Sequence, residues 1–525
     1  MNISKLQQSN YLLFAGLIML AAGLPVSFFL TSLSQFFIVG SFFLEGSFKA
    51  KFKNFIGNKA AVLLTLLWLF HLFGMLWTSD IDEGLKDLRI KLPLLILPIV
   101  LAGSGPLNKN QFNIVLGVFI AAVFGGSLVS VAVYNGFIQK ELHSIRDIFI
   151  FNVSHIRFAL FVCLSIFILF KTLIYKYLQK SYVSAAGLLA LTIWFLYFLV
   201  FIESITGILI LIFTVLVNLI WLAWRTKGVA IKGFIILTVL LIPLFIFSEV
   251  RSILSEYNVR QDYPADIDAK TESGNPYVTL DDNVLFENGY PIWAYVCEEE
   301  LRPQWNSISS IKYDSLDERE QPIRFTLIRF LASKGLKKDA EAIKSLSKDE
   351  VKSIEKGIAN VKYQNLSNTR IRLIQIVWEI DQYKKGLNPS GHSVTQRFEF
   401  WKAAIGIIKE NPLSGVGTGD MPEAYKEQYN KTDSKLSEKF RLRAHNQYLA
   451  FGVGLGIPLL LFFIFLLLYS LLSKENKKDY LFRSFWFIAV LSMLTEDTLE
   501  TQTGVTFFAF FLCFFLFSKP EKQTA

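Results

Sequence analysis

Long apolar blocks recur along this chain of 525 residues. Most are about 15 to 25 residues long, and an α-helix needs about 20 residues to cross roughly 30 Å of hydrocarbon. The pattern therefore predicts an all-α polytopic membrane protein with about twelve transmembrane helices, because blocks of this length recur about that often. The predicted spans are residues 10–25, 27–45, 60–77, 91–104, 111–138, 154–171, 183–202, 206–224, 233–248, 447–472, 481–497 and 503–518.

The first two spans adjoin each other. Residues 10–45 form one apolar run that is interrupted by Gly23, Leu24 and Pro25. Proline ends or kinks a helix, because it lacks the amide donor and its ring clashes with the preceding turn. We expect a tight helical hairpin here, and one long kinked helix is the alternative.

Basic residues in the short loops predict the orientation. They cluster in residues 49–59, 171–180, 225–232, 474–478 and 519–522. Short cytoplasmic loops retain Lys and Arg, and twelve spans with a cytoplasmic N-terminus put every cluster inside the cell. We therefore expect a multi-pass membrane protein with both termini in the cytoplasm.

The same topology puts one long hydrophilic segment, residues 249–446, on the outer side between spans nine and ten, which is the periplasm in a bacterial inner membrane. It contains 29 Lys and Arg against 30 Asp and Glu, so the rest of the chain, with 24 against 14, supplies the whole excess behind the net charge of +9. The excess of Lys and Arg over Asp and Glu thus reflects the membrane topology and does not indicate nucleic-acid binding. The expected organisation is spans one to nine over 1–248, the periplasmic segment over 249–446, and spans ten to twelve with a short cytoplasmic tail over 447–525.

The periplasmic segment is too long for a structureless loop, so we expect it to be ordered and mainly helical. Residues 256–325 predict irregular structure with a few helical turns, whereas 326–385 show helical patterns. Ser347 and Glu350 have the spacing of a helix-capping box. Cys163, Cys297 and Cys513 are too scattered for a disulfide framework or a Cys-x-x-Cys metal site. No metal or cofactor is expected.

Several motifs follow a break in the pattern at residues 388–391. Arg397 and Trp401 stand at the start of a predicted helix that ends at Asn-Pro-Leu-Ser-Gly-Val-Gly-Thr-Gly, residues 411–419. Ala-His-Asn-Gln-Tyr, residues 444–448, then leads into the tenth span. No strand precedes the glycine run, so it predicts turns, and anion contact by its amides is the alternative.

This combination resembles the O-antigen ligase and polymerase superfamily of bacterial inner-membrane glycan transferases. The motifs cover about 397–460, and the predicted span plan extends the resemblance along the chain. Members transfer a glycan from undecaprenyl pyrophosphate to an acceptor, commonly the core sugar of lipid A, without metal or nucleotide. The resemblance implies that Arg397 holds the donor pyrophosphate and that His445 activates the acceptor hydroxyl. Side-chain chemistry agrees, because Arg binds phosphate bidentately and His is neutral near pH 7.

The chain departs from the family at one place. The family often has Ser-Arg-Gly near the outer start of the eighth span, with the arginine as a second pyrophosphate ligand, but residues 204–207 here are Ser-Ile-Thr-Gly. We expect Arg157, at the outer start of the sixth span, to take that role, and snorkelling at the membrane surface is the alternative. Expected supporting residues are Arg443, His155 and Glu203.

Three further acidic residues are expected on the outer side, Glu496, Asp497 and Glu500. They either orient His445 or the arginines, or pair structurally, and we favour the structural role for most of them. Residues 256–385 either shape acceptor access or form a lineage-specific cover.

The predicted activity is an inverting, metal-independent glycan transfer at the periplasmic face. Its partners are a lipid-linked oligosaccharide or polysaccharide donor, a lipid A-core or other acceptor, and membrane lipid. O-antigen or exopolysaccharide polymerase and protein O-oligosaccharyltransferase share the donor chemistry and stay open. A transporter or flippase would carry more polar midplane helices. The sugar, the linkage and the oligomeric state are left open.

Overall fold

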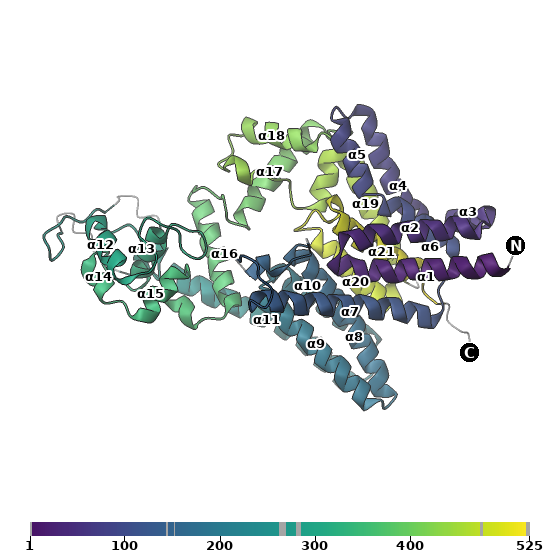
Figure 1. Ribbon diagram of the computed structural model, residues 1–525, viewed down its shortest axis with the longest axis horizontal. Coiled ribbons are helices and arrows are strands. Elements are labelled where there is room, and N and C mark those ends of the chain that lie inside the picture. Colours follow the sequence, from purple (N-terminus) through teal and green to yellow (C-terminus); the bar gives the residue numbers. More distant parts are fainter. Residues whose placement is uncertain are drawn as a thin grey trace. The chain divides into compact units, whose positions relative to one another are not determined.

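The computed structural model describes residues 3–142, 145–151, 153–261, 269–279, 285–472 and 476–520, which are mostly helical (Figure 1). Parts of the 256–325 segment and residues 474 and 522 of the basic clusters lie outside the described residues. Eight helical segments are long and apolar enough to cross a membrane. They are α2 (Phe28–Glu45), α4 (Lys59–Gly74) continued by η1 (Met75–Trp77), α7 (Lys109–Tyr134), α8 (His155–Leu178), α9 (Tyr182–Phe201), α10 (Ile205–Arg225), α11 (Val229–Asn258) and α19 (Gln447–Leu472).

Shorter apolar helices overlap the other predicted spans. They are the stretch Tyr11–Val26 of α1 (Ile3–Val26), α6 (Pro93–Ser104), α20 (Tyr480–Ser492) and α21 (Gln502–Phe517). Every predicted span thus overlaps an apolar helix, and the count of twelve crossings stays a prediction. The span predicted over 481–497 ends early, because α20 stops at Ser492 and the polar residues that follow form a loop with η6 (Thr498–Glu500).

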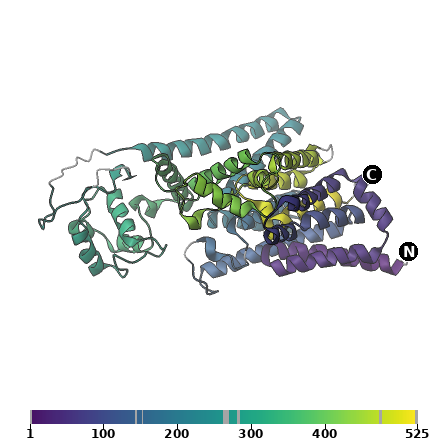
Figure 2. The ribbon, with the colours of Figure 1, turned by 90° about the horizontal axis from the view of Figure 1, so that it is seen from above.

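The first two helices are separate and lie side by side (Figures 1 and 2). α1 ends one residue after Pro25, and the Ser27 side chain caps α2 by accepting a hydrogen bond from the Leu30 amide at 3.1 Å. Gly23 allows the close approach, since a Cβ there would lie 2.8 Å from the backbone nitrogen of Thr31. The predicted hairpin is confirmed.

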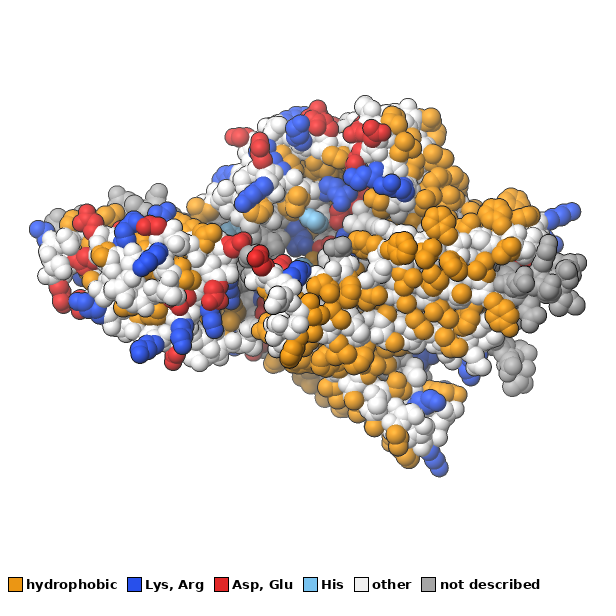
Figure 3. Space-filling model, viewed as in Figure 1, with side chains coloured by type: hydrophobic (Ala, Val, Ile, Leu, Met, Phe, Trp, Pro, Cys, Tyr) orange, Lys and Arg blue, Asp and Glu red, His pale blue; other side chains and the backbone are white. Residues whose placement is uncertain are grey.

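The chain divides into two compact units, and the first comprises residues 1–140, 148–235 and 396–525. The central helix of this unit is α21, whose residues 503–515 are all buried. Stacked or edge-on rings join it to α7, as between Phe112 and Phe514 at 4.5 Å and between Phe119 and Phe511 at 4.7 Å. Figure 3 shows hydrophobic side chains over α1 and α2, and charged side chains gathered over α5 (Ile81–Ile90) and α18 (Met421–Lys431).

The second unit comprises residues 141–147 and 236–395. It contains α12 (Glu298–Ile308), α13 (Ile323–Ser333), α14 (Ala340–Lys344), α15 (Lys348–Glu355), α16 (Asn368–Lys384) and the antiparallel pair β1 (Phe286–Glu287) and β2 (Tyr290–Pro291). Trp305, Tyr313 and Phe330 are fully buried in its own apolar core. The capping box of Ser347 and Glu350 is confirmed at the start of α15.

The units divide at other residues than the sequence predicted. The first boundary falls inside α11, which runs unbroken past residue 248. Residues 396–446, expected in one segment with 249–395, belong to the first unit. The physical reason is a shared core, in which Phe400 of α17 (Thr395–Glu410) and Tyr425 of α18 pack with Val453 of α19.

Candidate active site

Arg397 and Trp401 lie one helical turn apart on α17, so their side chains share a face. Trp401 Nε1 donates a hydrogen bond to the carbonyl oxygen of Ala444 at 2.9 Å. Arg397 Nη2 donates to the carbonyl oxygen of Thr495 at 3.3 Å and lies 3.4 Å from Glu496 Oε1. The two residues of this motif therefore fix two different loops, one before α19 and one after α20.

The residues around His445 bind those loops to each other. Three consecutive residues donate to carbonyl oxygens at the end of α20 and just beyond it: Asn446 to Leu494 (3.0 Å), the Gln447 amide to Met493 (2.9 Å) and Tyr448 to Val490 (3.0 Å). The Gln447 side chain also donates to Glu500 Oε1 at 2.9 Å. Each residue of the Ala-His-Asn-Gln-Tyr motif thus has a position fixed by contacts outside its own helix.

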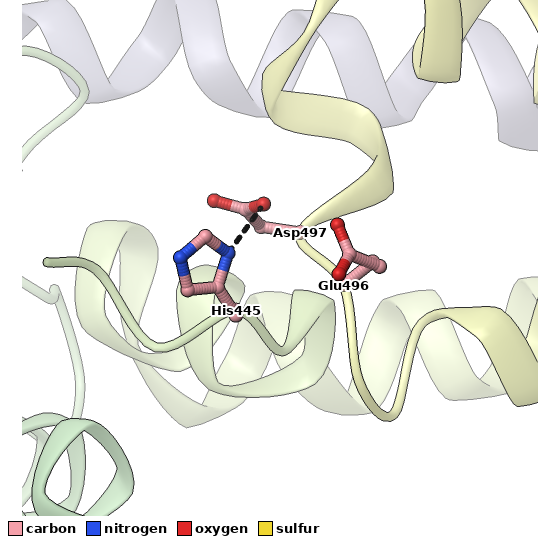
Figure 4. Close-up of side chains that lie close together, drawn as sticks. All are labelled: His445, Glu496 and Asp497. Carbon is pink, nitrogen blue, oxygen red and sulfur yellow. Dashed lines mark ion pairs between the residues drawn. The ribbon is translucent and has the colours of Figure 1, made fainter. Parts of the chain in front are cut away.

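His445 is held in a strained backbone conformation beside two carboxylates. Its φ of +45° lies in the left-handed region, where a residue other than glycine persists only when its surroundings fix it. Nδ1 lies 3.5 Å from Oδ1 of Asp497, which is buried. The opposite ring nitrogen, Nε2, points away from Asp497 and Glu496 (Figure 4). His445 can therefore be supported on one side while its other nitrogen meets a substrate.

The pKa values of the two carboxylates shift in opposite directions. Burial opposes ionisation of Asp497, but the contact with His445 and the charge of Arg443, which lies 3.1 Å away, outweigh burial and lower the pKa of Asp497. Burial raises the pKa of Glu496, although the charges of His445, Arg157 and Arg397 act in the opposite direction. Asp497 is thus the firmer counter-ion for His445.

The charge of Arg157 also acts on Glu496 and opposes the rise of its pKa. Arg157 lies in the first turn of α8, which the Ser154 side chain caps. Its Nε is buried and has no hydrogen-bond partner among the described residues. His155 starts the same helix. The role of Arg157 as a phosphate ligand stays a prediction, and the charges of Arg157 and Arg397 both act on Glu496.

Glu203 occupies the turn between α9 and α10, with a left-handed φ of +52°. The family arginine is absent from the next residues, 204–207. Here Ser204 caps α10 and accepts a hydrogen bond from the Gly207 amide at 3.3 Å. A Cβ on Gly207 would lie 2.8 Å from the Cβ of Ala159 on α8. This part of α10 therefore packs against the helix that carries Arg157.

A cleft of about 670 Å³ opens at His445. Its lining is strongly charged and carries both signs, with the cations Lys86, Lys426, Arg441 and Arg443 and the carboxylates Glu83, Asp87, Glu438 and Glu500. A lining of this kind suits a polar ligand such as a sugar with its hydroxyl groups.

A buried ion-pair network lies behind this cleft, and the sequence did not predict it. Lys91 is fully buried and donates to Asp87 and, at 2.8 Å, to Glu500. Burial opposes ionisation of Glu500, but the charges of Lys91 and Arg443 outweigh it and lower the pKa of Glu500 to about 2. Burial raises the pKa of Asp87 to about 6. The one sequence signal was the spacing of Asp87 and Lys91, which puts them on one helical face.

The glycine run of residues 411–419 serves close backbone packing. The amides of Val416 and Gly417 donate to the carbonyl oxygens of Val453 and Gly454, both at 2.9 Å. Gly415 has a φ of +64°, and a Cβ there would lie 2.4 Å from the carbonyl carbon of Gly454. The turn role is confirmed, whereas these two amides are not free to bind an anion.

His445, Glu496 and Asp497 also offer potential metal ligands within 4.8 Å of one another. Arg397 and Arg443 already compensate the two carboxylates, at 3.4 and 3.1 Å. A divalent cation would have to displace these guanidinium groups, so the donor set suits it poorly.

Residues 341–464 match the sequence model of the family described as O-Antigen ligase. The matched range contains Arg397, Trp401, the glycine run and His445 and ends before Glu496 and Asp497. No curated protein matches the chain. The family match supports placing the chain in the O-antigen ligase superfamily, which its motifs resemble.

Proposed function

We propose that this protein transfers a glycan from undecaprenyl pyrophosphate to a hydroxyl group of lipid A-core. The family match indicates glycan transfer of the O-antigen ligase or polymerase type. The observation that carries the proposal is the His445 and Asp497 pair, whose histidine lines a cleft of charged residues and whose neighbour Glu496 contacts Arg397. The active face is periplasmic, and both termini are cytoplasmic in the bacterial inner membrane.

In the proposed reaction, the acceptor oxygen forms a bond to the anomeric carbon while the bond from that carbon to the pyrophosphate oxygen breaks. The acceptor proton goes to Nε2 of His445, and the pyrophosphate leaves with the bonding electron pair. Attack opposite the leaving group inverts the anomeric configuration. Asp497 orients the imidazole and stabilises the imidazolium that forms. The separation of 3.5 Å between Nδ1 and Oδ1 would shorten in the substrate complex, as is common for catalytic hydrogen bonds.

The leaving pyrophosphate is held by Arg397 and Arg157. Guanidinium groups suit this role because they stay charged and bind phosphate oxygens in pairs. Arg397 contacts Glu496 in the free protein, and a pyrophosphate carries more negative charge than this one carboxylate. When the ligand draws Arg397 away, burial favours protonation of Glu496 and so limits the electrostatic cost. These groups supply the positive charge that the transfer needs without a metal ion.

Lipopolysaccharide banding in a deletion strain tests this function. Wild-type protein should restore the ladder of glycan attached to lipid A-core, and His445→Ala should not, although both proteins accumulate equally. Free lipid-linked polymer should build up in the mutant. Single repeats on lipid A-core would instead identify a polymerase, and loss of glycan from secreted proteins would identify a protein O-oligosaccharyltransferase.

A further inference from the structure

A second hollow, the α2–α6 groove, lies beside the cleft at His445. It has a volume of about 620 Å³, within the range of roughly 300 to 1,000 Å³ that is typical of ligand sites. Its apolar part is formed by Phe36 and Val39 of α2 and by Ile96 of α6. Phe36 is 75 % exposed. The chemistry of this part suits a hydrocarbon chain.

The other part of the groove is polar. Gln502, at the start of α21, donates to Ser32 of α2 at 2.7 Å. Arg89 and Gln35 also line the groove, and in the described part of the chain neither side chain has a hydrogen-bond or ion-pair partner. A cation and an amide left without partners beside an apolar channel suit a lipid with a phosphorylated headgroup.

Two chain segments link the groove to the cleft. The helix α5 contributes Lys86 and Asp87 to the cleft and Arg89 to the groove, and Ile90 lines both. After η6, Glu500 lines the cleft, whereas Gln502 lines the groove. A ligand in the groove can therefore extend its headgroup toward His445.

We propose that the α2–α6 groove binds an acyl chain of the glycan acceptor, with a headgroup phosphate on Arg89 and Gln35. This inference rests on the proposed function. It assigns the groove to the acceptor because the base His445 lines the adjoining cleft, whereas the proposed pyrophosphate ligands Arg397 and Arg157 line neither hollow. The acceptor is accordingly a phosphorylated glycolipid with fatty acyl chains.

Photocrosslinking in nanodiscs tests the groove with the full-length protein. A benzophenone amino acid replaces Phe36 in one variant and Phe29 in a matched control, which is 76 % exposed on the same helix but outside the groove. Three labelled probes are offered separately: lipid A carrying core sugars, undecaprenyl pyrophosphate, and phosphatidylglycerol. We expect position 36 to capture the glycolipid at least fivefold more than position 29. Equal capture at both positions, or preferential capture of either other lipid at position 36, overturns the proposal.

Arg89→Gln provides the second test. It should lower glycolipid capture at position 36 several-fold and raise the acceptor KM while kcat changes little, and Arg89→Lys should restore part of both. Arg225→Gln removes an exposed arginine of α10 and should change neither quantity. Unchanged capture and KM in Arg89→Gln contradict the phosphate contact. If the wild-type protein transfers glycan but position 36 does not capture the glycolipid, the acyl-chain site in the groove is refuted and the proposed function stands. If position 36 captures the glycolipid but the protein transfers no glycan, the proposed function is refuted and the groove stands as a lipid site.

Discussion

Nδ1 of His445 and Oδ1 of Asp497 lie 3.5 Å apart, although His445 precedes α19 and Asp497 follows α20, so that both helices separate them in the sequence. Asp497 is 3 % exposed and also pairs with Arg443. This relationship gives the histidine a fixed ring orientation, which a base needs in order to accept a proton from one defined direction.

Replacing Asp497 should therefore slow transfer without weakening acceptor binding. A general base raises the rate of the chemical step by about 10² to 10⁴-fold, so His445→Ala should lower kcat by a factor in this range. Asp497→Asn should lower kcat at least about tenfold because the imidazole is no longer oriented, with little change in acceptor KM. Steady-state kinetics in nanodiscs measure both constants. Glu410→Gln, which removes an exposed partner of Lys431, is the matched control and should retain activity. Equal kcat in Asp497→Asn and wild type would refute the positioning role.

Arg397→Lys should raise the donor KM and lower kcat. Lysine keeps the charge but cannot bind two phosphate oxygens in the planar geometry of arginine. Kinetics against a polyprenyl-pyrophosphate donor measure the effect, and Lys402→Gln is the control because Lys402 is exposed on the same helix. If the lysine variant binds donor as wild type does, the contact of Arg397 with Glu496 is structural only.

The buried network of Lys91 predicts a stability that depends on pH. Lys91→Met leaves the carboxylates of Asp87 and Glu500 without their ammonium partner, and breaking a buried pair in this way costs about 3 to 5 kcal/mol. The stability difference between Lys91→Met and wild type at pH 7 should shrink as the pH falls, because protonation neutralises the buried carboxylates. Thermal unfolding in detergent measures it, with the exposed Lys426→Met as control. A deficit that is equal at pH 7 and at pH 4 would contradict this explanation.

The wild-type protein should respond to acid in the opposite sense. Asp497 and Glu500 have lowered pKa values in the folded protein, so they release their protons at a lower pH when folded than when unfolded. Their stabilisation is complete above the ordinary carboxyl pKa of about 4. It is lost as the pH falls through the folded values, which is about 2 for Glu500. The Tm should therefore fall below about pH 4, and Asp497→Asn should show a smaller fall than wild type.

Gly415→Ala should prevent stable folding of the first unit. Its φ of +64° disfavours any side chain, and the new Cβ would lie 2.4 Å from the backbone of Gly454. We expect the free energy of unfolding to fall by at least about 2 kcal/mol, because backbone strain and the steric overlap of the new Cβ act together. Gly117→Ala in α7 is the control, since a Cβ there meets nothing within 4 Å, and it should be neutral or stabilising. Monodisperse yield and Tm in detergent distinguish the two variants.

The sequence by itself determined the local features. Apolar block length predicted the positions of the helices, Pro25 predicted the end of α1, and the spacing of Ser347 and Glu350 predicted a capped helix start. The motif spacing also placed Arg397 and Trp401 on one helical face. Each of these features depends on residues a few positions apart, whose geometry follows from the helix itself.

Only the tertiary structure decided which distant residues meet. The sequence left open whether Asp497 orients His445 or the arginines or pairs structurally, and the structure puts it beside both His445 and Arg443. Lys91 looked like the start of a span, yet it is buried with Glu500 as its partner. The same holds for the unit boundary, since residues 396–446 join the apolar helices through the core around Phe400 and Val453. Helix packing fixes such pairs because burial forces each charge to find a partner, and a linear sequence does not record which helix faces will be buried together.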